Sequence, residues 1–459
     1  MKLLKLFSTR ILITSLLLII QITWIVLFMI KLTSYSTWIN ASFTLLSILI
    51  ILYIIRKDEN AAYKIAWIIL IMSLPLFGGL FYLFFGNKGL SKHMQSLLIK
   101  ERLRVKEISL PDNSLLNKIG HDNSRVMGTC KYLQDKSNFL VYSNTSVLYY
   151  PLGELMYQDM LLELKKAEKY IFLEYFIIEN GVMWKGILDI LTEKAAMGID
   201  VRLIYDDFGS LFLLPNNFVK QMQHKGIKCI AFNRFRPILS LVMNNRDHRK
   251  ILVIDGTTAF NGGINLADEY INKKDRFGHW KDSGLKLTGD AVQSFTFMFL
   301  EMWNAFYKTK DSYEDYIITS LDLSKSDSVG FVQPFSDTPF DNETTSENVY
   351  IELLSQAKKY VYIFTPYLII DDEMKYALTM AAKRGIDVRI VTPGIPDKKI
   401  VYRLTRSNYA PLIKSGVRIY EYTPGFIHAK SYVCDDELAV VGTINMDYRS
   451  LYLHFECGT

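Results

Sequence analysis

Cysteine is scarce and scattered in this chain of 459 residues, and histidine is also uncommon. The spacing of the four cysteines contains no C-x-x-C pair, which is typical of ordinary reduced thiols. The seven histidines form no cluster with cysteines or carboxylates at metal-ligand spacing. The sequence therefore predicts no metal site and no cofactor. The cysteines are Cys130, Cys229, Cys434 and Cys457.

Charge is absent from three long stretches near the N-terminus, where the hydrophobic excess of the chain is concentrated. Each stretch is long enough to cross a bilayer as a helix. The alternative, that all three are buried helices of a soluble domain, explains three such segments in a row poorly. The first has too long an uncharged core for a signal peptide, and no clear cleavage site follows it. Residues 1–87 are therefore predicted to be a retained membrane anchor with two to three transmembrane segments. The segments are 11–30, 37–55 and 65–85, and the third contains Pro75 and is expected to kink or re-enter.

Residues 88–107 are rich in lysine and arginine among leucines and are assigned as a basic juxtamembrane linker. A basic helix lying on anionic headgroups and a solvated linker helix both account for this stretch. The net charge of the whole chain is +6, which suits an anionic membrane surface or phosphate substrates. The basic clusters around the apolar segments do not decide which side of the membrane the rest of the chain faces.

From about residue 108 the pattern becomes globular, with apolar strands that alternate with helices, as in α/β domains. The order of these segments recurs in the second part of the chain, and such self-similarity marks duplicated domains. The join lies near 315–345, a polar stretch rich in Ser, Asp and Thr. We therefore predict two α/β halves, 108–320 and 321–459. The second ends directly after a strand, without a closing helix, and so is expected to lack its C-terminal end.

One short motif occurs twice, once in each half. A single H-x-K-x4-D pattern is weak evidence, but two copies with the same downstream Gly and Asn are a strong signal. Lys follows His by two positions in both copies, Asp by seven and Asn by seventeen. The residues are His248, Lys250, Asp255 and Asn265 in the first copy, and His428, Lys430, Asp435 and Asn445 in the second.

Both copies are apolar and β-branched, so each is predicted to be a strand. Side chains alternate between the faces of a strand, so His248 and Lys250 share a face, as do His428 and Lys430. Asp255 is an odd number of positions from its His and points away from it or lies in the turn beyond. For the motif carboxylates, a structural or turn role is therefore favoured over orientation of their own His.

This double motif resembles the signature of the phospholipase D superfamily, and it is closer still to the bacterial cardiolipin synthases. The likeness covers most of the chain from about residue 40. It extends to 365–367, 385–389, 423–428 and 442–450. The resemblance implies two phospholipase D-like halves that meet at a pseudo-two-fold active site, preceded by N-terminal transmembrane helices.

Two half-sites with one His each indicate a single site for phosphodiester chemistry. One imidazole attacks phosphorus and the other protonates the leaving alkoxide. The two lysines, with Asn265 and Asn445, would hold the phosphate oxygens without a metal. The resemblance implies a covalent phosphohistidine, with His248 as nucleophile and His428 as acid. The predicted catalytic site thus contains both His and Lys pairs together with Asp255 and Asp435 as motif members.

Other charged residues have two competing explanations each. Glu174 and Glu456 lie in apolar strands, where an acid is costly unless it is paired. For each of them, orientation of a catalytic His and exposure at a sheet edge are equally good explanations. Four cations of the second half are candidates for a second phosphate, or else form a solvated helix face. They are Lys398, Lys399, Arg403 and Arg406. The other five histidines, His93, His121, His224, His279 and His454, are assigned to surface or core.

Three functions compete. The first is a multi-pass enzyme of the bacterial plasma membrane that condenses two phosphatidylglycerols to cardiolipin and glycerol. The second is a phospholipase D-type hydrolase acting on lipid or nucleic acid. The third is a non-catalytic membrane scaffold, which two intact motifs disfavour. Phosphatidylglycerol and anionic membrane lipid are the expected partners, no nucleic acid is expected, and the oligomeric state is left open.

Overall fold

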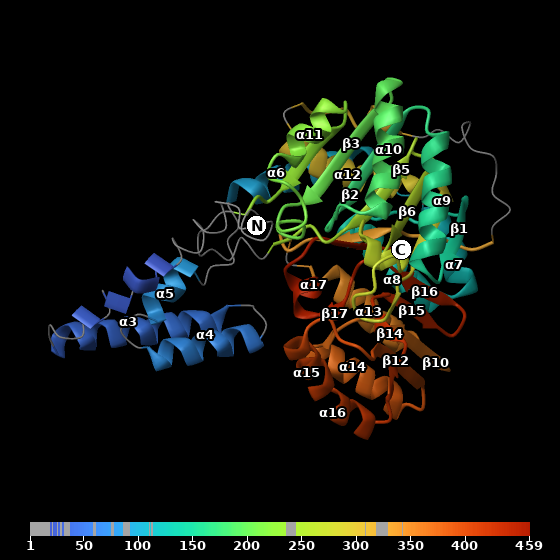
Figure 1. The fold of residues 1–459 in the computed structure, drawn as a ribbon. Coiled ribbons are helices and arrows are strands. Elements are labelled where there is room, and N and C mark those ends of the chain that lie inside the picture. The colour runs from blue at the N-terminus through green and yellow to red at the C-terminus, as the bar shows by residue number, and fades with distance from the viewer. Residues whose placement is uncertain are drawn as a thin grey trace. The chain divides into compact units, whose positions relative to one another are not determined.

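The fold is described from a computed structural model (Figure 1). The chain divides into two compact units, Met1–His93 with Phe235–Asn244, and Met94–Arg234 with Asn245–Thr459. The structure describes residues 37–57, 61–74, 78–85, 92–109, 111, 113–235, 245–307, 309–317, 329–341 and 343–459, together with a few residues between 19 and 31.

Three helices form the described part of the first unit: α3 (Thr37–Arg56), α4 (Ala61–Ser73) and α5 (Gly78–Phe85). Ile50, Ile54, Ile71 and Tyr82 pack together as their small core. A Cβ at Gly78 would lie 2.4 Å from the Cα of Ile71. Glycine is therefore required where α5 approaches α4 this closely.

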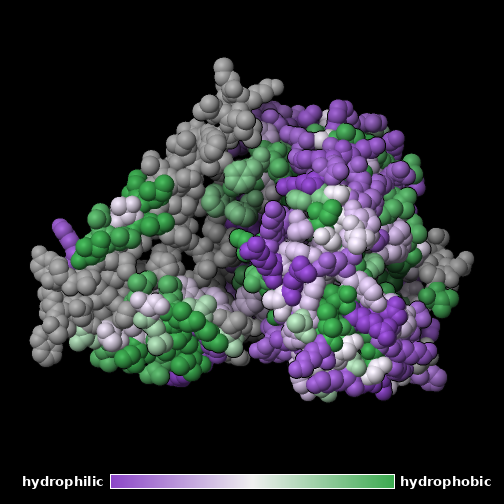
Figure 2. All heavy atoms as spheres, turned by 60° about the horizontal axis from the view of Figure 1, so that its bottom comes forward, coloured by the Kyte–Doolittle hydropathy of each residue, from purple (hydrophilic) through white to green (hydrophobic). Residues whose placement is uncertain are grey.

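The outward side chains of these three helices are mostly apolar, as Figure 2 shows for one face of the molecule. The predicted segment 37–55 coincides with α3, whereas 65–85 is covered by two helices instead of one. The predicted segment 11–30 lies largely outside the described residues. Within the part of the chain that the structure describes, no helix has both the length and the apolar character needed to cross a membrane. The transmembrane segments therefore stay a prediction.

Most of the basic stretch assigned as a linker lies in helix α6 (Lys92–Ile108). Most of this helix belongs to the second unit. Leu98 and Val105 are buried, and the guanidinium of Arg102 lies 2.6 Å from the Asp341 carboxylate. Glu101 is fully buried and pairs with Lys310 at 2.8 Å. One face of α6 is thus packed on the rest of the second unit, which neither explanation of the linker anticipated.

The first half of the second unit contains a seven-stranded sheet in the order β1-β8-β6-β5-β2-β3-β4. Strands β2, β3 and β4 are parallel, and β5 runs antiparallel beside β2. The strands are β1 (Thr145–Tyr150), β2 (Tyr170–Tyr175), β3 (Asp200–Asp206), β4 (Lys228–Phe232), β5 (Lys250–Ile254), β6 (Thr258–Gly262) and β8 (Gly284–Gly289).

The second half repeats this arrangement in a five-stranded sheet of order β13-β12-β10-β15-β16. The parallel set β10, β12 and β13 corresponds to β2, β3 and β4, and the antiparallel β15 corresponds to β5. The predicted duplication into two α/β halves is therefore confirmed. The strands are β10 (Tyr360–Phe364), β12 (Asp387–Pro393), β13 (Arg418–Tyr422), β15 (Ser431–Cys434) and β16 (Leu438–Val441).

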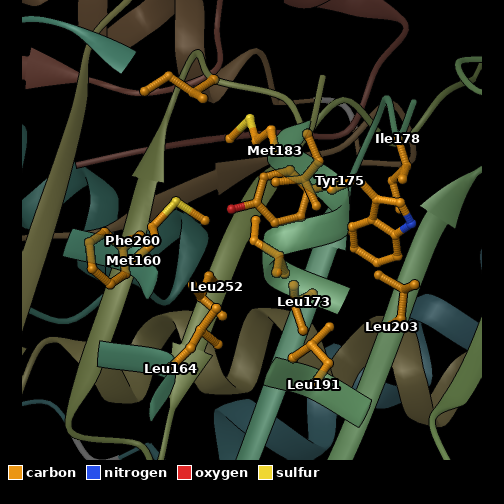
Figure 3. Packing of buried hydrophobic residues seen from close by; sticks show 14 of the residues in the cluster. Met160, Leu164, Leu173, Tyr175, Ile178, Met183, Leu191, Leu203, Leu252 and Phe260 are labelled. Atoms are coloured by element: carbon orange, nitrogen blue, oxygen red, sulfur yellow. The ribbon is translucent and has the colours of Figure 1, made fainter. Parts of the chain in front are cut away.

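Helices cover both faces of the first sheet, and β5 is buried along its length, with an apolar run from Ile251 to Ile254 after Lys250. Helices α9 (Gly153–Lys166) and α10 (Val182–Ala196) bury Met160, Leu164 and Leu191 against β2, β3 and β5 (Figure 3). On the other face lies α12 (Val292–Phe306), where Phe299 stacks on Phe172 of β2 with ring centroids 4.6 Å apart. This packing fixes the strand that follows His248.

Short strands and helices complete the unit and connect the halves. The strands are β7 (His279–Lys281), β9 (Phe335–Asp337), β11 (Leu368–Ile369), β14 (Gly425–Ile427), β17 (Met446–Asp447) and β18 (Glu456–Gly458). The helices are α7 (Asn113–Asp122), α8 (Ser124–Ser137), α11 (Phe218–His224), α13 (Thr345–Gln356), α14 (Asp372–Lys383), α15 (Lys399–Ser407), α16 (Tyr409–Lys414) and α17 (Tyr448–Tyr452), with 3-10 turns at Asp268–Ile271 and Glu314–Tyr316.

Helix α8 falls within the predicted first half but packs against the second. Arg125 donates to the backbone oxygen of Gln356 at 3.3 Å, and Tyr132 donates to Glu343 at 3.0 Å. Helix α8 thus belongs to the first half in sequence and supports α13 of the second half in space. The predicted range of the first half, 108–320, therefore includes a helix whose contacts are with the second half.

The motif carboxylates Asp255 and Asp435 lie in the turns after β5 and β15, at the opposite ends of these strands from the histidines. Asp255 accepts hydrogen bonds from the backbone N–H groups of Glu168, Lys169 and Tyr170 at 2.7–2.8 Å. Asp435 makes the same three bonds one repeat later. Both have positive φ, 52° and 55°. Each carboxylate therefore anchors the start of the neighbouring strand, the structural role that the alternation favoured.

Asp255→Ala should lower the free energy of unfolding by about 2–4 kcal/mol, because three N–H groups lose a charged acceptor. Urea or thermal unfolding measures the change, and turnover per folded molecule should be nearly the same as in the wild type. Asp255→Asn is the matched control, since it keeps one acceptor oxygen and tolerates positive φ; it should lose less stability. An Ala variant that is stable but inactive would instead give Asp255 a part in the chemistry.

Candidate active site

The first motif histidine lies in the loop before β5 and is almost fully buried. The Nδ1 atom of His248 is 2.8 and 2.9 Å from the two carboxylate oxygens of Glu456. Glu456 is fully buried, and Thr443 donates a hydrogen bond to it. The ring of Phe176 stands edge-on to His248, with centroids 4.9 Å apart. The carboxylate that orients the first histidine is thus supplied by the second half.

The second motif histidine has the reciprocal arrangement. The Nδ1 atom of His428 is 2.7 Å from the Oδ2 atom of Asp282, which belongs to the first half and is fully buried. Tyr270, Trp280 and Phe426 surround the ring, with centroids 5.4, 5.5 and 5.9 Å from that of His428. Each half therefore contributes one histidine to the site and one carboxylate to the histidine of the other half.

Backbone pairing across the halves produces this exchange. Strand β14 runs parallel to β7, and the N–H of His428 donates to the oxygen of Lys281 at 2.7 Å. At the equivalent place in the other half, the N–H of His248 donates to the backbone oxygen of Phe455 at 2.9 Å. A parallel bridge between Asp247 and Phe455 lies next to this bond. Two equivalent main-chain contacts thus hold the two histidine–carboxylate pairs in register.

The two motif lysines are buried beside the histidines. The ammonium of Lys250 donates to the backbone oxygen of His248 at 2.5 Å. Lys430 lies 2.9 Å from the Nδ1 atom of His428 and also donates to its backbone oxygen. As predicted from the alternation of side chains, each Lys lies with its own His. Buried ammonium groups at these positions favour an anionic ligand.

Burial lowers the pKa of both lysines, that of Lys250 to about 8 and that of Lys430 to about 7. Burial also lowers the pKa of His428 to about 4 and that of His248 well below its usual range, and the charge of the adjacent lysine adds to both shifts. A bound phosphodiester anion would favour the protonated form of all four groups, because an opposite charge nearby raises their pKa. The site is therefore built to become positively charged when an anion enters it.

The two motif asparagines occupy equivalent positions, and each donates to a hydroxyl five residues later. Asn265 donates to the Tyr270 hydroxyl at 2.7 Å and accepts from the N–H of Ile177 at 3.0 Å. Asn445 donates to the Ser450 hydroxyl at 3.1 Å. Each amide nitrogen retains a second hydrogen. The predicted phosphate contacts of Asn265 and Asn445 stay a prediction.

Of the two strand glutamates with open roles, only Glu456 contacts a motif histidine. Glu174 instead lies 2.6 Å from the guanidinium of Arg249. The four cations considered for a second phosphate are exposed, in agreement with a solvated helix face. Lys398 and Arg406 lie 3.7 and 3.6 Å from Asp397 and Glu421.

Asp282 was not among the predicted site residues, although the duplication contained a signal for it. Asp282-Ser283-Gly284 follows the first motif as Glu456-Cys457-Gly458 follows the second. In each repeat an acid, a small residue and glycine occupy equivalent places. His454, which was assigned to surface or core, is buried, and its ring centroid is 5.4 Å from that of His248.

Asp282→Asn should reduce kcat by about a hundredfold or more with little change in KM, because an amide no longer favours the correct tautomer and the protonated form of His428. Initial rates over a range of substrate concentrations and pH provide the test, and the pH profile should change with kcat. Asp189→Asn, at an exposed helical position, is the control. If Asp282→Asn lowers the rate further in a His428→Ala background, Asp282 does not act through His428.

Two family models match the chain. The model described as the cardiolipin synthase, phospholipase D-like domain matches residues 160–303 and 350–459, one segment in each half. The model of the phospholipase D-nuclease N-terminal family matches residues 45–87. The matched segments contain both motif histidines, both lysines and the two orienting carboxylates.

Similar proteins cover most of this chain. A protein of Streptococcus mutans is 46% identical over 409 residues, 89% of this chain and 88% of its own. A cardiolipin synthase of Alkalihalophilus pseudofirmus is 35% identical over 426 residues, 91% of this chain and 83% of its own. The crystal structure of phosphatidylserine synthase from Haemophilus influenzae shares the fold, with a TM-score of 0.53 and 17% identity over 72% of this chain and 85% of its own.

Proposed function

We propose a specific reaction for this chain, which belongs to the family of phospholipase D-like cardiolipin synthases and is an enzyme of that kind. It transfers a phosphatidyl group from one phosphatidylglycerol to the glycerol hydroxyl of a second, and releases glycerol. The observation that carries the proposal is the reciprocal pairing of two histidines with carboxylates of the opposite halves, beside two buried lysines.

In the first step the Nε2 atom of His248 attacks phosphorus, and the bond from phosphorus to the glycerol headgroup oxygen breaks. His428 gives its proton to that oxygen, so glycerol leaves as a neutral alcohol. The phosphatidyl group is now bound to His248 as a phosphohistidine. Hydrogen bonding at Nδ1 leaves Nε2 of each ring for this chemistry.

In the second step a hydroxyl of the acceptor phosphatidylglycerol attacks the same phosphorus. Its proton goes to His428, the bond from phosphorus to His248 breaks, and cardiolipin leaves. The two steps are formally the reverse of one another at phosphorus, so one set of groups serves both. The assignment of nucleophile and acid follows the family pattern, because each histidine pairs with a carboxylate at Nδ1 and this pairing does not distinguish the two roles.

Water competes with the acceptor alcohol, and its concentration is far higher. Transfer therefore requires a site that excludes water and an acceptor that is held close. The buried histidines and lysines meet the first requirement. For the second, we infer that the apolar N-terminal helices attach the enzyme to the bacterial plasma membrane as a multi-pass anchor, where anionic phosphatidylglycerol is locally concentrated.

The test is to incubate the purified full chain with liposomes of labelled phosphatidylglycerol and measure all products. Cardiolipin and glycerol should form in equal amounts, and added glycerol should convert cardiolipin back to phosphatidylglycerol. A chelator should not reduce the rate, because lysines and asparagines stabilise the charge. Phosphatidic acid and glycerol as the main products would instead establish a hydrolase.

A further inference from the structure

His454 has no role in the proposed chemistry, yet its ring lies 5.4 Å from that of His248 and only 8% of the residue is exposed. Neither of its ring nitrogens has a hydrogen-bond partner among the described residues. Its Nδ1 atom is 3.6 Å from the Oε1 atom of Glu456, which is too long for a hydrogen bond. A buried polar group without a partner requires an explanation.

His248, His454 and Glu456 present three ligand atoms that all lie within 4.8 Å of one another. The nitrogen–oxygen separations, 2.8 Å from His248 to Glu456 and 3.6 Å from His454 to Glu456, bracket the spacing in a tetrahedral zinc site. That spacing is about 3.4 Å, because zinc binds nitrogen and oxygen at about 2.0–2.1 Å. Two imidazoles and one carboxylate also form a known ligand set for zinc with an open fourth position.

The other half of the duplicated site lacks this arrangement. Trp280 precedes Asp282 by two positions, as His454 precedes Glu456. An indole cannot bind a metal through an accessible lone pair, so His428 and Asp282 have no third ligand at that place. The departure from the pseudo-two-fold symmetry therefore predicts one metal ion per chain.

We propose that His248, His454 and Glu456 bind one zinc-class divalent ion, which inhibits the enzyme. A metal at Nδ1 of His248 replaces its hydrogen bond to Glu456 and withdraws electron density from the ring. The Nε2 atom then becomes a poorer nucleophile. The inhibition rests on the proposed role of His248, whereas the binding of the ion does not.

The lysines of the site limit the affinity for such an ion. Lys250 is buried against His248, and the charges of Lys250 and Lys430 both act on that histidine, so they repel a metal cation there. We therefore expect binding in the micromolar range, far weaker than at a structural zinc site. Reversible inhibition by free zinc is consistent with that range.

The direct test is titration of the chelator-treated, desalted full chain with Co²⁺, whose visible absorption is intense in tetrahedral sites. One equivalent should bind, and Zn²⁺ should displace it. His454→Gln should weaken binding by at least about tenfold, since even outer partners of a metal site contribute that much. The exposed His224→Gln is the matched control and should bind as the wild type does.

The activity test measures turnover against free zinc, each variant relative to its own zinc-free rate. The wild type and His224→Gln should be inhibited and recover with chelator, whereas His454→Gln should need at least about tenfold more zinc. His454→Asn serves if the Gln variant does not fold. Equal cobalt binding by the folded His454 variants, or cobalt–thiolate charge-transfer bands from cysteine ligands, would overturn the proposal. If the lipid assay fails, the cobalt titration still tests the site.

Discussion

Alanine at either His248 or His428 should reduce turnover by at least about a thousandfold, the loss expected when a nucleophile or an acid is removed from a site that acts as a unit. The two halves supply different roles, so neither histidine can replace the other. Both side chains are fixed by carboxylates of the opposite half and are buried. Lipid transfer assays on purified variants, with His224→Ala as the exposed control, measure the effect.

A substrate with an acidic phenol in place of glycerol separates the two roles, because a phenolate leaves without a proton. His428→Ala should release the phenol at a substantial rate and accumulate a labelled phosphohistidine. His248→Ala should do neither. The opposite pattern would exchange the two roles, and substantial residual activity with the natural lipid in either variant would exclude a single shared site.

Loss of either buried lysine should be the next most damaging change. Lys250→Met and Lys430→Met keep most of the side-chain volume but remove the ammonium that would hold the phosphoryl oxygens. We expect a loss of about 3–4 kcal/mol of transition-state stabilisation, or about 100–1,000-fold in kcat/KM. Lys→Arg should not restore activity, because a guanidinium differs from an ammonium in shape. The exposed Lys398→Met is the control.

The lysine variants also have an expected effect on pH dependence. The charge of Lys430, after burial, lowers the pKa of His428. Removing that charge favours the protonated imidazole, so the pKa of His428 should rise and the alkaline limb of the pH–rate profile should move to higher pH. A profile that does not move, together with a loss below about tenfold in kcat/KM, would mean that Lys430 does not act on this site.

Several features of the site were determined by local sequence. Two copies of one motif, each followed by Gly and Asn, identified both histidines and both lysines. The alternation of side chains along a strand placed each His with its Lys, and it directed Asp255 and Asp435 away from the chemistry. The structure agrees with the placement of each Lys and of each Asp, because these two features depend only on the geometry of a single strand. The alternating strands and helices likewise sufficed for the duplicated α/β fold.

Contacts between the halves were decided only by the tertiary structure. Asp282 and Glu456 are distant in sequence from the histidines they orient, and each approaches its partner through main-chain pairing with the opposite half. Side-chain alternation carries no information about such pairing, so Glu174 and Glu456 were equivalent candidates until the fold placed one on Arg249 and the other on His248. The same holds for α6 and α8, because local sequence does not specify which element covers one face of each helix. His454 gained its position in the same way: the chain fixes its place two residues before Glu456, and the pairing of Phe455 with the loop before β5 brings it to His248.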